Sequence, residues 1–145
     1  MARILRNTPY TIITLIVFNI VILFSAADVW ENEIATIRLL SDAQWTLSLG
    51  DLMVVGGLIA LLAEMLRATY VAAFGNHLVS IIILIVYVIE FIAVADAANS
   101  TFFILTVIAL VDVLGGVTIT IRHASRDITM DGSYMHHGPG PIPPP

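Results

Sequence analysis

The segment TFFILTVIALVDVLGGVTITI, residues 101–121, determines how the rest of this 145-residue chain must be interpreted. It contains one charged residue, Asp112, near its centre. As a helix the segment is about 30 Å long, which matches the hydrocarbon thickness of a bilayer. A carboxylate at that depth costs at least about 2.5 kcal/mol when it faces lipid. We therefore expect a transmembrane helix that turns Asp112 toward other parts of the protein.

The composition indicates a membrane protein. Hydrophobic residues make up 59% of the chain and charged residues 12%, with a mean hydropathy of +0.97. Soluble domains carry about 25% charged residues. The net charge of −5 and the absence of lysine argue against a nucleic-acid partner. The absence of cysteine excludes disulfides, thiol catalysis and cysteine-ligated metals.

We predict an all-α integral membrane protein with a four-transmembrane-helix bundle. The domain covers residues 1–127, and its helices are expected at about residues 11–27, 47–66, 78–95 and 101–121. Asp51 and Glu64 leave only twelve uncharged residues between them, so a re-entrant hairpin is the alternative for the second helix. Residues 128–145, rich in proline and glycine, are expected to form a flexible cytoplasmic tail.

The arginines favour four crossings. With four crossings, five of the six arginines lie on one side of the membrane and only Arg38 lies on the other. The positive-inside rule then places both termini in the cytoplasm. The use of arginine alone suggests a bacterial source, and hence the plasma (inner) membrane.

Residues 28–45 form a separate segment between the first two helices. Trp30, Ile34, Ile37 and Leu40 recur at spacings of three or four residues, which favours a short external amphipathic helix on the membrane surface. Trp30 and Trp45 bracket the segment and are expected to act as interface anchors. A solvated loop is the alternative.

Four polar residues are expected in one layer near the middle of the membrane. Counted from the cytoplasmic edge, Asn19, Tyr87 and Asp112 lie about 13 Å deep and Glu90 about 18 Å deep. The main interpretation is a buried hydrogen-bond network that joins the helices. The alternative is a proton or cation path with Glu90 and Asp112 as exchange sites. A third possibility is a bound quinone or lipid.

Small residues mark the expected packing faces of two helices. They allow close approach of neighbouring helices. These residues are Gly56, Gly57, Ala60, Gly115 and Gly116.

The sequence contains few candidate residues for metal binding or catalysis. His77 and His123 are weak candidates for a metal or haem site at the cytoplasmic edge, which a redox-enzyme membrane anchor would require. Glu64 and Arg67, one turn apart, are expected to form an ordinary ion pair with Glu64 reaching outward. The sequence lacks a phosphate-binding loop and a zinc-protease motif. We expect no cofactor and no enzymatic activity.

These observations predict a small non-enzymatic polytopic membrane protein. Its expected partners are the lipid bilayer and either further copies of itself, as a homo-oligomer, or the subunits of a larger membrane complex that it serves as an accessory subunit. The alternatives are the proton- or cation-conducting protein and the redox anchor described above.

Overall fold

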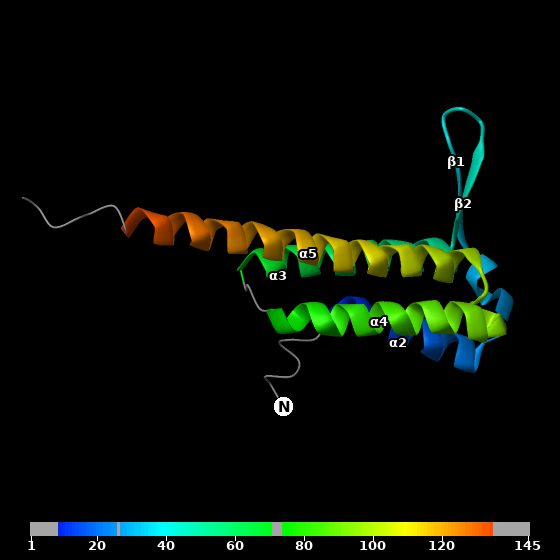
Figure 1. The fold of residues 1–145 in the computed structure, drawn as a ribbon. Helices are drawn as coiled ribbons and strands as arrows, with labels where there is room; N and C mark the ends of the chain where they lie inside the picture. The colour runs from blue at the N-terminus through cyan, green and yellow to red at the C-terminus, as the bar shows by residue number, and fades with distance from the viewer. Residues whose placement is uncertain (1–8, 26, 71–73, 135–145) are drawn as a thin grey trace, which may run out of the picture.

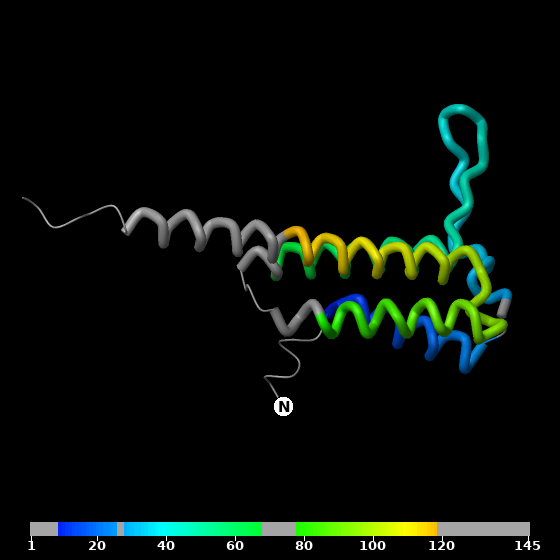
Figure 2. The backbone as a smooth tube through the Cα atoms, viewed as in Figure 1, coloured from blue at the N-terminus to red at the C-terminus, as the bar shows by residue number. Residues whose placement is uncertain are grey.

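The structure is a computed structural model that describes residues 9–25, 27–70 and 74–134, with side chains described for residues 9–25, 28–67 and 78–118. This part of the chain is mostly helical, as predicted. Its long helices run back and forth beside one another (Figure 1). They are α2 (Thr11–Phe24), α3 (Leu49–Tyr70), α4 (Phe74–Ala93) and α5 (Ser100–Tyr134). Figure 2 traces the same path through the Cα atoms.

Helix α5 is central, because it packs against α2, α3 and α4. Phe102 of α5 is fully buried and lies where three helices meet. Its ring centroid is 4.4 Å from that of Phe18 on α2 and 5.3 Å from that of Tyr87 on α4. Tilted aromatic pairs at these distances contribute about 0.5–1.5 kcal/mol beyond the area they bury. The core therefore begins at the first turn of the apolar segment 101–121.

Two helices are long and apolar enough to cross a membrane. The qualifying segments are Leu49–Arg67 of α3 and Ser100–Thr118 of α5, each 19 residues long. Helix α2 and the apolar part of α4, Leu78–Ala93, are shorter. Helix α3 is continuous, so the re-entrant alternative for this segment is wrong.

The first turns of α3 and α5 show why these helices begin where they do. Ser48 and Asp51 form a reciprocal cap at the start of α3: the Ser48 N–H donates to Asp51 Oδ2 at 2.9 Å, and the Asp51 N–H donates to Ser48 Oγ at 3.1 Å. Asn99 caps α5, because its Oδ1 accepts from the Phe102 N–H at 2.9 Å.

Helix α5 extends further than predicted. It ends only at Tyr134, so residues 128–134 are helical rather than part of a flexible tail. Residues 135–145 of the predicted tail lie outside the described chain.

The predicted amphipathic helix at residues 28–45 is wrong. The segment forms a 3₁₀ turn, η1 (Ala27–Glu31), and an antiparallel hairpin of β1 (Glu33–Arg38) and β2 (Gln44–Ser48). Its β-branched and aromatic residues favour strands, and its apolar residues fit an alternating pattern as well as a helical one. Asp42, with φ of 61°, provides the left-handed residue that closes the turn.

The expected role of Trp30 as an interface anchor is also wrong. Trp30 is 4% exposed, and its ring stacks on Phe18 with centroids 4.6 Å apart and planes 4° apart. Trp45, by contrast, is 47% exposed on β2. Because Trp30 of η1 stacks on Phe18 in the middle of α2, only the second tryptophan stays on the surface.

The predicted small residues divide into packed and open positions. A Cβ atom on Gly57 would lie 2.8 Å from Leu105 Cδ2, and one on Gly115 would lie 3.1 Å from Met65 Cε. Both positions therefore serve the contact between α3 and α5. Gly56 was expected on the same face, but it is exposed, and a Cβ atom there would have nothing within 4 Å among the described residues. Ala60 and Gly116 are half-buried.

Substituting alanine at these adjacent glycines should separate packing from helix propensity. Gly56→Ala and Gly57→Ala both remove a helical glycine, which favours folding by about 0.5–1 kcal/mol at each position. Only Gly57→Ala forces a methyl group against Leu105, so it should be less stable than Gly56→Ala by about 1–3 kcal/mol. Denaturant unfolding of both variants in detergent micelles measures this difference. Equal stability would show that the α3–α5 contact tolerates the added methyl group.

Candidate functional site

Polar side chains meet between the helices at three levels along α2. We name them the inner pair (Glu64 and Arg67), the central cluster (Thr11, Thr14, Tyr87 and Asp112) and the outer pair (Asn19 and Glu90). The inner pair lies at the end of the bundle where α2 begins, because Glu64 bonds to Tyr10, and the outer pair lies nearer the end where α2 stops.

The inner pair closes the start of α2. Glu64 accepts from Arg67 at 2.6 Å through Oε1 and from the backbone N–H of Tyr10 at 3.1 Å through Oε2. The Arg67 guanidinium also lies 4.8 Å from the centroid of the Tyr10 ring. The ion pair agrees with the prediction, but Glu64 is 5% exposed and does not reach outward. It turns inward because the first N–H groups of a helix need acceptors.

The central cluster joins α2, α4 and α5. The Thr11 hydroxyl donates to Asp112 Oδ2 at 3.3 Å, and the Tyr87 hydroxyl donates to the Thr11 carbonyl at 3.1 Å. The Thr14 hydroxyl lies 2.9 Å from the Tyr87 hydroxyl and 2.7 Å from the Thr11 carbonyl. All four side chains are buried. The Thr11 hydroxyl thus provides a donor to a carboxyl group that is buried among apolar residues.

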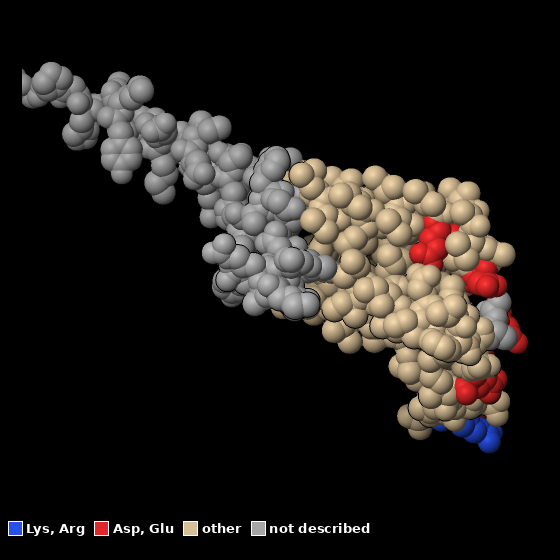
Figure 3. Space-filling view, turned by 90° about the horizontal axis from the view of Figure 1, so that it is seen from below, with Lys and Arg blue, Asp and Glu red and all other residues tan. Residues whose placement is uncertain are grey.

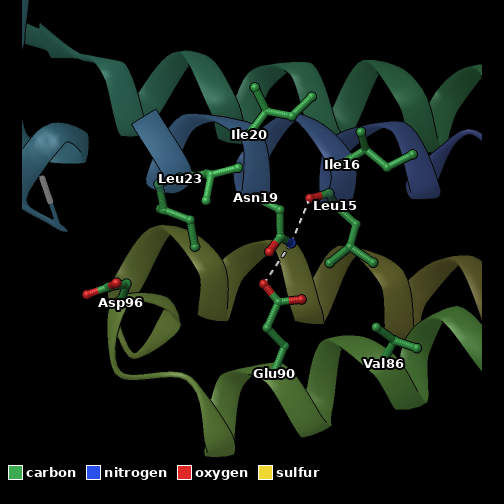
Figure 4. Close-up of a pocket in the computed structure, with 9 residues that line it drawn as sticks. Leu15, Ile16, Asn19, Ile20, Leu23, Val86, Glu90 and Asp96 are labelled. Atoms are coloured by element: carbon green, nitrogen blue, oxygen red, sulfur yellow. Dashed lines mark hydrogen bonds between the residues drawn. The ribbon is translucent and has the colours of Figure 1, made fainter. Parts of the chain in front are cut away.

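The outer pair joins α2 to α4 beside a groove. Asn19 Nδ2 donates to Glu90 Oε1 at 2.7 Å and to the Leu15 carbonyl at 3.0 Å (Figure 4). The groove has a volume of about 600 Å³, and Asp96 lies at one end of it. The rest of its lining is aliphatic and comprises Leu15, Ile16, Ile20, Ile22, Leu23 and Val86. Asn19 and Glu90 are half-buried, so the pair is more open than the central cluster.

The four residues predicted for one polar layer are therefore found in two groups. Tyr87 and Asp112 belong to the central cluster, and Asn19 belongs with Glu90. The prediction put Asn19 at the same depth as Tyr87 and Asp112, with either Asp112 or Glu90 as its partner, because it counted depth from assumed helix ends. Such counting does not include how far the helices are displaced along their axes: Asp112 lies level with Thr11, about 12 Å from Asn19 along α2.

Thr11 and Thr14 were not predicted as members of the polar site. A signal was present: these threonines, Leu15 and Phe18 follow the spacing of one helix face, and that face is the buried side of α2. Threonine in an apolar helix also satisfies its hydroxyl on the preceding turn, as Thr14 does here, so it attracts less attention than a charge.

The described side chains form no candidate metal site. Within residues 9–25, 28–67 and 78–118, no group of three His, Asp or Glu side chains is placed to hold a metal ion. The side chains of His77 and His123 lie outside the described residues. Conduction through Glu90 and Asp112 stays a hypothesis, because hydroxyl and carboxyl groups of this kind occur both in structural networks and in proton relays.

A double-mutant cycle should measure the bond between α2 and α4. Tyr87→Phe keeps the ring contact with Phe102 and removes the hydroxyl, while Thr14→Val removes its partner. We expect a coupling of about 0.6–1.7 kcal/mol in unfolding free energy, the range for such bonds between membrane helices. As a control, Thr118→Val removes an exposed hydroxyl that bonds within α5, and its effect should add to that of Tyr87→Phe within about 0.5 kcal/mol. If the effects of Tyr87→Phe and Thr14→Val were additive as well, the two hydroxyls would not be coupled, and a linked central cluster would be contradicted.

No known family model, curated protein or solved structure matches this chain, so its function must be argued from its own residues.

Proposed function

We propose that this chain is an integral membrane protein whose four helices all cross the bilayer. The support comes from the outward faces of the helices, each of which carries large apolar side chains. Examples, one from each helix, are Ile20 at 50%, Leu62 at 58%, Ile89 at 59% and Leu114 at 56% exposure. Charged side chains gather toward one end of the surface seen in Figure 3, and most of that flank is uncharged. Water would disfavour so much contiguous apolar surface, and lipid would not.

The short length of α2 is compatible with this proposal. Its 14 residues span about 21 Å, less than the roughly 30 Å hydrocarbon core. The start of α2 is bonded within the protein, because the Tyr10 N–H donates to Glu64. The last residues of α2 are open, with Leu23 76% and Phe24 81% exposed. A bilayer accommodates a helix shorter than its hydrocarbon core by local thinning, at a modest free-energy cost.

Within that membrane we propose a non-enzymatic role in assembly. The observation that carries this proposal is that the buried polar side chains bond to one another across the helices: Thr11 to Asp112, and Thr14 to Tyr87. Hydrogen bonds of this kind hold a bundle together and need no substrate. The partner is a further copy of the chain or a subunit of a larger membrane complex.

A surface groove between α2 and α3 is the contact surface we assign to that partner. It has a volume of about 360 Å³, and small side chains on one wall let another helix come close. The lining from α3 includes Gly56, Ala60 and Ala63, and that from α2 includes Ile13 and Val17. If lipid alone filled this groove, Gly56 would take part in no close contact between helices.

The proposed topology can be tested with single cysteines, since the chain has none. Ser41, exposed in the hairpin turn, should lie outside the cell, and Ser133 should lie in the cytoplasm. Ser41→Cys should therefore react with an impermeant maleimide in intact cells, whereas Ser133→Cys should react only after permeabilisation. The opposite pattern would invert the topology, and labelling of both in intact cells would contradict the proposed set of crossings.

The proposed assembly can be tested by native mass spectrometry in mild detergent. We expect a mass that is a multiple of 15.7 kDa, or the mass of a complex with a second protein. Gly56→Leu should fill the groove and release the monomer, because overpacking costs about 1–3 kcal/mol. Val55→Leu, at an exposed neighbouring position outside the groove lining, is the matched control and should leave assembly intact. A wild-type protein that is monomeric and captures no partner would contradict an assembly role.

A further inference from the structure

The hairpin that replaces the predicted helix has two chemically different faces. Residues paired across an antiparallel ladder share a face, and neighbours along a strand alternate between faces. Ile37 pairs with Trp45, and Ala35 pairs with Leu47, so one face is apolar. On the opposite face, between the tip and the irregular register at Ile34, lie two polar pairs. These are Thr36 with Thr46, whose hydroxyls lie 3.2 Å apart, and Arg38 with Gln44.

Toward the tip of the hairpin, the apolar face has no cover within the described chain, whereas Leu47 at its base is half-buried. Ile37 is 51% exposed and Trp45 is 47% exposed. An isolated two-stranded hairpin is marginally stable in water, so an uncovered apolar face calls for a partner. Leu40, at the tip, is fully exposed as well.

The position of the hairpin indicates what that partner is. The strands leave the bundle at the end where α2 stops and α3 begins, and they run across the direction of the helices (Figures 1 and 2). If the helices lie along the membrane normal, as proposed above, the hairpin lies along the membrane plane. Its height is then that of the outer ends of the helices, where headgroups meet acyl chains.

We propose that the apolar face of the hairpin rests on the outer interface of the bilayer, with Trp45 as its anchor. The inference depends on the proposed membrane insertion. Tryptophan is enriched at this depth because its ring is apolar and its N–H is polar. The polar face then meets water, as does the exposed ion pair between Arg38 and Asp42, whose charged atoms are 3.1 Å apart. Amphipathic segments bind interfaces in this way, with the apolar side toward the acyl boundary.

Fluorescence of Trp45 tests this placement, and the structure provides a way to isolate it. The chain has two tryptophans, and Trp30→Phe removes the other one. Trp30 is buried with its Nε1 unpartnered within the described residues, and phenylalanine preserves its stacking on Phe18. The Trp30→Phe protein is reconstituted in liposomes whose acyl chains carry bromine near the headgroup or near the bilayer centre. We expect Trp45 to be quenched about two-fold more by the shallow bromines, as interfacial tryptophan is.

Two variants and a flotation assay make the outcome decisive. In the Trp30→Phe background, Ile37→Glu charges the apolar face and should reduce shallow quenching, whereas Thr36→Glu charges the polar face and should leave it unchanged. A protein that floats with the liposomes but shows no quenching of Trp45 overturns the inference and leaves the proposed function standing. Blue-shifted emission without quenching would also overturn it, since a second protein surface would then cover the face instead of lipid. Failure to float with liposomes would overturn the proposed membrane insertion, and the inference with it.

Discussion

The burial of one carboxyl group within an apolar bundle is the constraint on which the other features depend. Asp112 is 7% exposed on the central helix, and a buried carboxyl group without donors is strongly unfavourable. Helix α2 brings the Thr11 hydroxyl to it, and the carbonyl of the same residue accepts from Tyr87 of α4. One threonine thus orients three helices relative to one another. The aromatic contacts of Phe102 fill the space between the same three helices.

The fourth helix is held by a different kind of contact. Gly57 of α3 lies against Leu105 and Ile108 of α5 so closely that a methyl group in its place would crowd both side chains. Close approach increases dispersion contacts over a large area, without any need for polar groups. The bundle therefore combines hydrogen bonds on one side of α5 with tight apolar packing on the other. Polar groups inside and apolar groups outside are the arrangement that a bilayer favours, which supports the proposal that all four helices cross a membrane.

The polar residues that drew attention in the sequence do form bonds between helices, but their pairing was not predictable. Charge and amide groups are conspicuous in apolar segments, so Asn19, Glu90 and Asp112 were evident without coordinates. Their grouping depends on how far each helix is displaced along its axis, which counting from assumed helix ends does not give. Asp112 lies level with Thr11, and Glu90 lies level with Asn19, about 12 Å further along α2. The same limitation hid the inward direction of Glu64, which is set by the N–H of Tyr10 at the start of another helix.

The sequence by itself determined the membrane-like composition, the mostly helical fold and the two longest apolar helices, because these follow from local hydrophobicity over about 20 residues. Only the tertiary structure decided that residues 33–48 form a hairpin and that Trp30 is buried. In that short segment the apolar residues fit a helical period and an alternating period equally well, so the local signal is degenerate. The physical reason for the outcome is non-local: β1 and β2 satisfy their backbone groups on each other, and Phe18 of α2 provides the ring on which Trp30 stacks.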